Sequence, residues 1–159
     1  MKTIKLSNAN KVTIVNDKDY ARFHRYRWRL SGRGYVIRHA PGHRKPRKVI
    51  FLHREIINTP AGKITDHVDG DPLNNTRKNL RVCTHQENLR NQTKQKRKNK
   101  YSRYKGVSFG YKKWIAYITL DSKTYRLGSF RTEKEAARAY NLAASVIYGD
   151  FARLNNLHK

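Results

Sequence analysis

The chain has 159 residues, enough for one ordinary domain or two small ones, and its 37% hydrophobic content is sufficient for compact cores. It carries 36 Lys and Arg against 11 Asp and Glu, a formal net charge of +25. Self-repulsion of that size destabilises a compact protein, so we expect a polyanionic partner, with nucleic acid as the first candidate. A basic protein that only coats RNA is an alternative that charge alone does not separate.

Membrane insertion, secretion and cysteine-based sites are disfavoured. No run of about 18 apolar residues is present, and the N-terminus MKTIKLSNANKVTI alternates apolar with polar residues, unlike a signal peptide. We therefore expect an intracellular protein. Cys83 is the single cysteine, which excludes a disulfide framework and a cysteine-based zinc cage within one chain. A bound metal would need oxygen and nitrogen ligands.

The first third of the chain predicts a small antiparallel sheet with a basic face. Its short strand-like runs are KVTIV, RWRL, YVIRH and KVIFLH, separated by turn residues. From Arg22 to Arg54 there are 11 Lys and Arg and no acid. With no acid nearby to pair with, these cations are expected to contact the phosphate backbone, although solvated arginines on a twisted sheet are an alternative.

Residues 63 to 93 are consistent with a strand, a loop, a strand and a helix. KITDHV is the first strand, DGDPLNNTRK the loop and NLRVCT the second strand, and THQE is a capping box with Thr84 as the N-cap of a helix running to about Thr93. Asp66 and His67 should leave the first strand on opposite faces, and Asn88 can point back toward it. We interpret the other acids and amides of the loop as turn formers: Asp69, Asp71, Asn74 and Asn75.

These residues suit phosphodiester chemistry with one metal ion. The carboxylate of Asp66 and the amide oxygen of Asn88 are donors for a hard cation such as Mg²⁺, with Mn²⁺ possible, that keeps waters and binds phosphate. The imidazole of His67, with an ordinary pKa of about 6.5, can accept a proton from water. A calcium loop of the EF-hand type is excluded, because its closing glutamate would fall on Arg77.

The remaining chain contains a basic connector and a second small domain. Residues 92 to 103, QTKQKRKNKYSR, hold six basic residues and no acid, and we interpret them as a tether along a duplex, with a localisation signal as the alternative. YKGVSF, WIAYITL and KTYRLGSF then predict three strands, and TEKEAARAYNLAASVIYG predicts a helix capped by Thr132 and Glu135 and ended by Gly149. Its expected buried stripe is Ala136, Tyr140, Ala143 and Ile147.

Residues 1 to 92 resemble the HNH, or His-Me finger, nucleases, most closely the homing branch from phages and introns. The resemblance lies in Asp66-His67, Asn74-Asn75, Asn79-Leu80, the Asn88 and Asn91 pair, and LHREI at 52 to 56. It implies that His67 is the general base, that Asp66 and Asn88 are metal ligands, and that Asn79 holds the imidazole by a hydrogen bond. The metal would stabilise the departing 3′ oxygen, leaving a 5′-phosphate and a 3′-hydroxyl. Many relatives carry a histidine where this chain has Asn88.

Residues 104 to 156 resemble the DNA-binding domain of plant ethylene-response (Apetala-type) transcription factors, through YKGV, LGSF, TEKEAARAYNLAA and GDFARLN. The resemblance implies a sheet lying in the major groove, although a scaffold role is an alternative. The side chains expected to face the helix are Trp114, Ala116, Ile118, Tyr125 and Leu127. Those left for DNA are Lys105, Ser108, Lys112, Lys113, Tyr117, Thr119, Thr124 and Arg126. The arginines by which plant members read GC-rich sites are missing, so their target sequence is not carried over.

The combined expectation is an α+β protein: a ββα-metal nuclease domain in residues 1–92, a linker in 93–103, and a domain of three-stranded antiparallel sheet packed on one helix in 104–159. The expected function is site-specific, metal-dependent cleavage of double-stranded DNA by a monomer that nicks one strand, unless two molecules act together; the alternative is a non-catalytic DNA-binding regulator. Further DNA contacts are expected from Arg54, Asn91, Lys94, Lys96, Arg97 and Lys98. His53 is expected to be either a DNA contact or a structural histidine.

Overall fold

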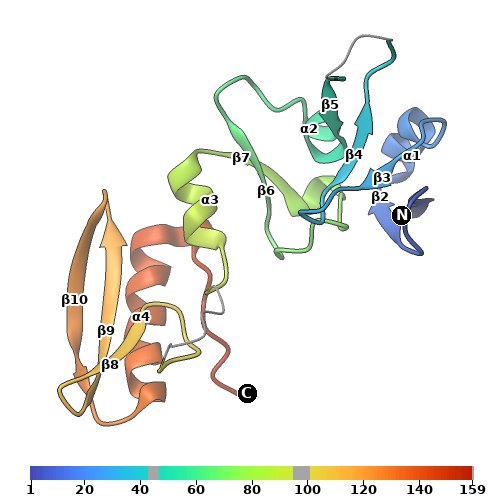
Figure 1. The fold of residues 1–159 in the computed structure, drawn as a ribbon. Coiled ribbons are helices and arrows are strands. Elements are labelled where there is room, and N and C mark those ends of the chain that lie inside the picture. The colour runs from blue at the N-terminus through green and yellow to red at the C-terminus, as the bar shows by residue number, and fades with distance from the viewer. Residues whose placement is uncertain (43–46, 95–100, 159) are drawn as a thin grey trace. The chain divides into compact units, whose positions relative to one another are not determined.

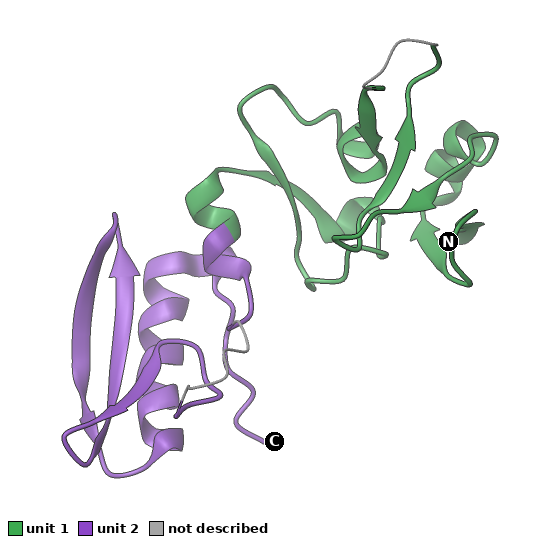
Figure 2. Cartoon of the chain, in the orientation of Figure 1, with its two compact units in different colours: residues 1–88 green, residues 89–159 purple. Residues whose placement is uncertain are grey.

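A computed structural model describes residues 1–42, 47–94 and 101–158. The chain divides into two compact units, residues 1–88 and residues 89–159 (Figure 2). The three basic residues expected to contact DNA at positions 96 to 98 lie outside the described residues. Within the described ranges, no helix has the length and apolar character needed to cross a membrane.

The first unit contains three small antiparallel sheets and short helices (Figure 1). The sheets are β1 (Lys2–Lys5) with β2 (Val12–Val15), β3 (Arg29–Leu30) with β4 (Val36–His39) and β5 (Val49–Phe51), and β6 (Ile64–His67) with β7 (Leu80–Cys83). The helices are α1 (Asp17–Phe23), α2 (Leu52–Ile57), the 3-10 turn η1 (Arg77–Asn79) and α3 (His85–Asn91), which continues past the unit boundary. The run KVIFLH is thus a strand only up to Phe51, and LHREI belongs to a helix.

One hydrophobic core joins these pieces. Val15, Val36, Leu52 and Ile56 are fully buried, and Trp28 is 1% exposed. The cluster also includes Ile4, Leu6, Phe23 and Leu80. Because these residues come from β1, β2, β4, α1, α2 and β7, the core fixes the β6–β7 hairpin relative to the N-terminal segments.

The loop between β6 and β7 is docked on β2. The N–H of Ile14 donates to the carbonyl of Leu73 at 2.9 Å, and the N–H of Asn75 donates to the carbonyl of Ile14 at 2.9 Å. Nearby, the fully buried carboxylate of Asp19 accepts from Nη2 of Arg77 at 2.7 Å and from Nε at 2.8 Å. The loop is therefore held by contacts with residues about sixty positions earlier in the chain.

The second unit is a three-stranded antiparallel sheet with one helix, as predicted (Figure 1). Its elements are β8 (Val107–Gly110), β9 (Lys113–Leu120), β10 (Lys123–Phe130), α4 (Glu133–Tyr148) and the 3-10 turn η2 (Gly149–Phe151), with β9 in the centre. The capping box of Thr132 and Glu135 is present at the start of α4. Ala116 and Ile118 of β9 are buried in the clusters that the helix completes.

Two details of this packing differ from the prediction. The stripe of α4 is Ala136, Ala137, Tyr140, Ala144 and Tyr148, whereas Ile147 is 38% exposed. Tyr148 replaces it because its hydroxyl reaches the backbone of Thr119 in β9, donating to the carbonyl and accepting from the N–H at 3.1 Å. Tyr125 lies opposite Ile118 and so shares the face toward α4, as expected, yet it is 51% exposed because it lies on the edge strand β10.

Candidate functional site

Strand β6 carries Asp66 and His67 on opposite faces. In the register of the β6–β7 pair, Asp66 lies opposite Arg81 and His67 lies opposite Leu80. Because successive side chains of a strand alternate, the carboxylate and the imidazole project to different sides of this two-stranded sheet. Each of the two residues is 6% exposed. The pair is thus held by main-chain pairing and largely removed from bulk water.

The imidazole of His67 lies in a cluster of aromatic rings. Its centroid is 5.2 Å from that of His53 at an interplanar angle of 80°, and 6.2 Å from that of Tyr35. His53 in turn packs on Tyr35 at 5.3 Å and on Phe51 at 5.4 Å. Burial lowers the pKa of His67, although the hydrogen bond with Asn75 and the charge of Asp69 act in the opposite direction. The imidazole is therefore neutral at neutral pH and able to accept a proton.

His53, for which a structural position and a DNA contact were both expected, sits inside the protein. It is 6% exposed, and its Nδ1 has no hydrogen-bond partner among the described residues. Burial, followed by the charges of His67 and Arg54, lowers its pKa to about 3. Arg54, half-buried beside it, donates to the carbonyls of Lys63 at 3.0 Å and Pro60 at 3.3 Å. His53 thus belongs to the interior of the site, a role that the strand pattern did not indicate.

The amide that meets the imidazole belongs to Asn75, and the expectation for Asn79 is corrected. Oδ1 of Asn75 lies 3.2 Å from Nε2 of His67, and Asn75 is fully buried. The side chain of Asn79 instead closes the loop: it accepts from the N–H of Asp69 at 3.0 Å and donates to Oδ1 of Asp69 at 2.9 Å and to the carbonyl of Asn74 at 2.8 Å. Asn79 shapes the loop that carries Asn75. Asn75, interpreted from the sequence as a turn former, is the residue that contacts the imidazole.

Asp66 is engaged by a cation of its own hairpin. Arg81 donates to Oδ2 of Asp66 from Nη2 at 2.7 Å and from Nε at 2.9 Å. The described ranges contain no cluster of three or more His, Cys, Asp and Glu side chains arranged to hold a metal ion.

Asn88 lies in the first turn of α3, and its backbone is hydrogen-bonded to Cys83 of the β6–β7 hairpin. Cys83 lies opposite Ile64 in the β6–β7 register and so shares the face of Asp66. Burial, followed by the charges of Asp66 and Glu87, raises the pKa of the Cys83 thiol to about 11, and a backbone hydrogen bond from Asn88 opposes the shift. The thiol links the first turn of α3, including Asn88, to that face of the sheet. The capping box of Thr84 and Glu87 starts this helix as predicted.

Two lysines expected to contact DNA are internal hydrogen-bond donors of the second unit. Nζ of Lys94 donates to the carbonyls of Tyr104 at 2.7 Å and Val107 at 2.9 Å. Nζ of Lys105 donates to the carbonyls at the end of α3, those of Leu89, Arg90 and Gln92 at 3.2, 2.5 and 2.7 Å. Burial lowers the pKa of Lys105 to about 8. A helix end leaves such carbonyls without partners, which is why an ammonium group binds there.

Asn91 at the end of α3 is 6% exposed and lies in the second unit. Its burial does not favour the expected role of a surface contact with DNA, and the sequence pattern alone gave no sign of it.

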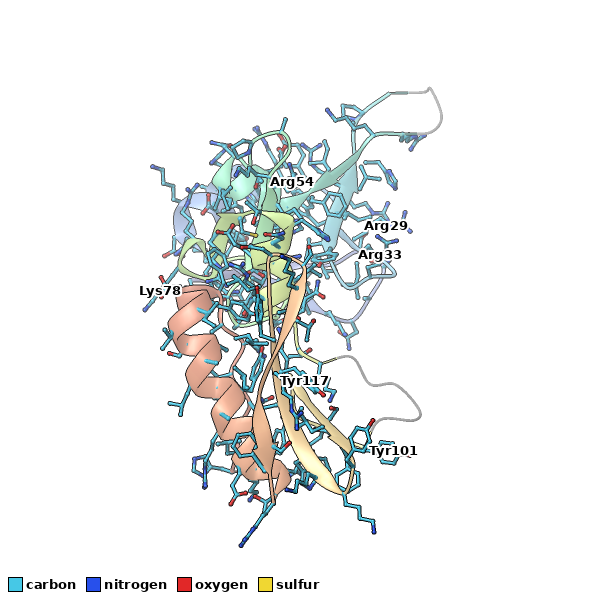
Figure 3. The ribbon with its side chains drawn as sticks, turned by 90° about the vertical axis from the view of Figure 1, so that its left-hand side faces the viewer. Arg29, Arg33, Arg54, Lys78, Tyr101 and Tyr117 are labelled. Atoms are coloured by element: carbon cyan, nitrogen blue, oxygen red, sulfur yellow. The ribbon has the colours of Figure 1, made fainter. Side chains whose placement is uncertain are left out.

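The face of the sheet away from α4 carries the other expected contacts. The strand register places Ser108 opposite Ile115, Tyr117 opposite Arg126, and Thr119 opposite Thr124, so these side chains share one face. Lys112, in the turn that precedes β9, and Lys113, the first residue of β9, are exposed. Tyr117 projects from β9 in Figure 3, and Arg29 and Arg33 of the first unit project from the β3–β4 hairpin. The face is polar, apart from Ile115, and positively charged.

Comparison with known proteins shows which family the chain resembles. A family model described as HNH endonuclease matches residues 58–90, which contain β6, η1, β7 and most of α3. A relative described as an uncharacterized HNH endonuclease of Acanthamoeba polyphaga mimivirus is 31% identical over 134 residues, 84% of this chain and 68% of the relative. Dehydration-responsive element-binding protein 2E of Arabidopsis thaliana is 43% identical over 68 residues, 36% of this chain and 28% of that protein.

No solved structure matches the chain. The nuclease and DNA-binding relatives together suggest DNA as the partner. Since the viral relative is matched over most of both chains, and since the matched family segment contains the Asp66-His67 hairpin, this chain belongs to the HNH endonuclease family.

Proposed function

We propose that the protein is a site-specific, metal-dependent DNA endonuclease of the homing type, which hydrolyses a phosphodiester bond to a 5′-phosphate and a 3′-hydroxyl. It nicks one strand as a monomer, on DNA inside a cell. The observation that supports this best is the buried imidazole of His67, whose pKa is lowered by burial and which follows Asp66 directly in β6. The two consecutive residues supply a proton acceptor on one face of the strand and an anionic ligand on the other.

The proposed ββα-metal arrangement consists of β6, β7 and α3. Residues 1–92 would form the nuclease domain, 93–103 the linker and 104–159 the second domain. The compact units meet between residues 88 and 89, within α3, so this helix contributes to both. Asn88 then belongs to the nuclease side, in keeping with its proposed role as a metal ligand.

The donor set fits a hard divalent cation. One carboxylate oxygen from Asp66 and one amide oxygen from Asn88 leave most coordination positions to water and phosphate, which is the habit of Mg²⁺ and is also compatible with Mn²⁺. Arg81, bonded to Oδ2 of Asp66, would share that carboxylate with the cation. When bound, the metal would stabilise negative charge on the departing 3′ oxygen.

The remaining chemistry belongs to side chains of this chain. His67 removes a proton from the attacking water, which general bases of this kind accelerate by about 10²- to 10⁴-fold. The rings of His53 and Tyr35 cover the imidazole and keep it neutral. Asn79 maintains the loop beneath it by its bonds to Asp69 and Asn74. The basic β3–β4 region and Arg54 bind phosphates of the substrate.

The second unit would extend the recognition site as an Apetala-type domain. Its support is the shared outer face of Tyr117, Arg126, Thr119 and Thr124, together with the partial similarity to the plant DNA-binding protein. Hydroxyl and guanidinium groups on one face of a sheet can reach base edges in the major groove. The other proposed contacts of this face are Ser108, Lys112 and Lys113.

The second candidate function is that of a non-catalytic DNA-binding regulator. It is favoured by the ion pair of Asp66 with Arg81, since a carboxylate already compensated by a guanidinium binds a cation less strongly. Supercoiled plasmid incubated with Mg²⁺ and the full chain separates the two. The endonuclease predicts nicked circles that His67→Ala reduces by about 10²-fold or more and that the exposed control His158→Ala leaves unchanged. Unchanged nicking by His67→Ala refutes the catalytic assignment, and DNA binding without nicking favours the regulator.

A further inference from the structure

The hydrogen bonds of Asn75 lead from the candidate centre into the N-terminal hairpin. Nδ2 of Asn75 donates to Oγ1 of Thr13 at 2.8 Å and to the carbonyl of Pro72 at 3.0 Å, and its Oδ1 faces Nε2 of His67 at 3.2 Å. Thr13 is on β2 and, like Asn75, is fully buried. The hydroxyl of Thr13 also contacts the carbonyl of Leu73 at 2.8 Å. A chain of buried hydrogen bonds thus joins residues 62 positions apart.

The polarity of this chain is determined by its ends. The carbonyl oxygens of Pro72 and Leu73 only accept hydrogen bonds. The single hydroxyl hydrogen of Thr13 is directed at Leu73, so its oxygen accepts from the amide nitrogen of Asn75. Both hydrogens of that amide nitrogen are then used, and the amide oxygen is the atom left to face His67. An amide oxygen donates nothing, so Nε2 of His67 must carry a hydrogen.

We propose that Thr13 and Asn75 are positioning residues of the nuclease, which hold His67 with its hydrogen on Nε2 and leave Nδ1 as the nitrogen that accepts the proton from water. A neutral imidazole has one hydrogen, so the group bonded to one nitrogen decides which nitrogen is basic. This inference rests on the proposed role of His67 as general base. It adds Thr13 of β2, which lies outside the matched segment 58–90, to the residues that position the imidazole.

The backbone contacts of the same hairpin explain why the bond is held in place. The N–H of Asn75 donates to the carbonyl of Ile14, the residue after Thr13, and Ile14 and Asn74 form a parallel bridge. The side chain and the main chain of the loop are therefore anchored to the same two residues of β2. Movement of β2 would shift the amide and the imidazole together.

The first experiment reads the tautomer directly. Long-range ¹H–¹⁵N correlation spectra of the full chain, assigned by comparison with His67→Gln, show which ring nitrogen of His67 carries the hydrogen. The proposal expects hydrogen on Nε2 in the wild type and a larger Nδ1–H population in Thr13→Val, which keeps the shape of threonine but removes the hydroxyl. Hydrogen on Nδ1 in the wild type would overturn the proposal. This result requires no cleavage, so it decides the positioning claim even if the nuclease assignment fails.

The second experiment measures nicking at saturating Mg²⁺ and DNA. Thr13→Val is expected to lower kcat by about 10- to 100-fold with KM unchanged, as a displaced base does, whereas Thr13→Ser, which restores the hydroxyl, should remain within about threefold of wild type. The matched control is Thr3→Val, the same substitution on the exposed face of β1 in the same hairpin. Equal kcat for Thr13→Val and wild type contradicts the proposal. A loss shared by Thr3→Val, or one that Thr13→Ser does not restore, assigns Thr13 a structural role only and also contradicts it.

Discussion

The ion pair of Asp19 with Arg77 gives a quantitative test of how the loop is anchored. Asp19 is fully buried, and Arg77 bonds both of its carboxylate oxygens, at 2.7 and 2.8 Å. Arg22 is a second cation, 3.7 Å away. Removing one partner of a buried pair costs about 3–5 kcal/mol. Because the side chain of Arg77 is 45% exposed and Arg22 remains, we expect Arg77→Met to lower the unfolding free energy of the first unit by about 2 kcal/mol.

The assay uses the two tryptophans, one in each unit. In a Trp114→Phe background, the fluorescence of the buried Trp28 reports urea unfolding of the first unit alone. With a slope of about 1–2 kcal/mol per M, the Arg77→Met midpoint should fall by about 1–2 M. The double variant Asp19→Asn/Arg77→Met should recover part of the loss, because no buried charge is left unpaired. A loss below about 0.5 kcal/mol, or no recovery in the double variant, refutes the reasoning.

Three further outcomes are expected. Gly106→Ala should destabilise the second unit by at least about 2 kcal/mol in urea unfolding followed by Trp114 fluorescence, because Gly106 has φ +71° and an added Cβ would lie 2.0 Å from the ring of Tyr140 on α4. Gly32→Ala, with open space around it, should be neutral by Trp28 fluorescence. Between pH 7 and pH 5, the unfolding free energy of the first unit in urea titrations should fall by as much as about 2 kcal/mol. The reason is that the unfolded chain protonates His53 below its ordinary pKa of 6.5, whereas the folded state, with a pKa of about 3, does not. His53→Phe should remove most of this pH dependence, and an unchanged pH dependence contradicts the lowered pKa. Lys113→Ala should reduce the slope of log Kd for DNA against log salt concentration by about one unit. Lys105→Met should leave that slope unchanged and lower the unfolding free energy of the second unit by about 1–2 kcal/mol. A reduced slope for Lys105→Met would show that Lys105 contacts phosphate after all.

The elements with strong local signals were predictable. The alternation in WIAYITL determines that Ala116 and Ile118 face α4, and the capping boxes at Thr84 and Thr132 begin their helices where the sequence indicates. These patterns succeed because they depend on neighbours within a few residues. Helix α1, a short segment of seven residues with few apolar positions, gave no comparable signal.

The candidate site was only partly predictable. The adjacency of Asp66 and His67 and their projection to opposite faces follow from the strand period alone. The choice between Asn75 and Asn79 does not, because two asparagines in one loop are equivalent until the loop is docked on β2. Likewise, Lys105 is indistinguishable by composition from Lys113, yet one binds the end of α3 and the other is exposed.

The sequence by itself determined the charge, the order of strands and helices, and the residue types that can carry out phosphodiester hydrolysis. Only the tertiary structure decided which of these residues meet. Asp66 pairs with Arg81 across a hairpin, and His67 is bonded to Asn75, which is bonded to Thr13 more than fifty residues before His67. The physical reason is that hydrogen bonds and burial depend on distances in space, whereas periodicity and capping depend on distances along the chain.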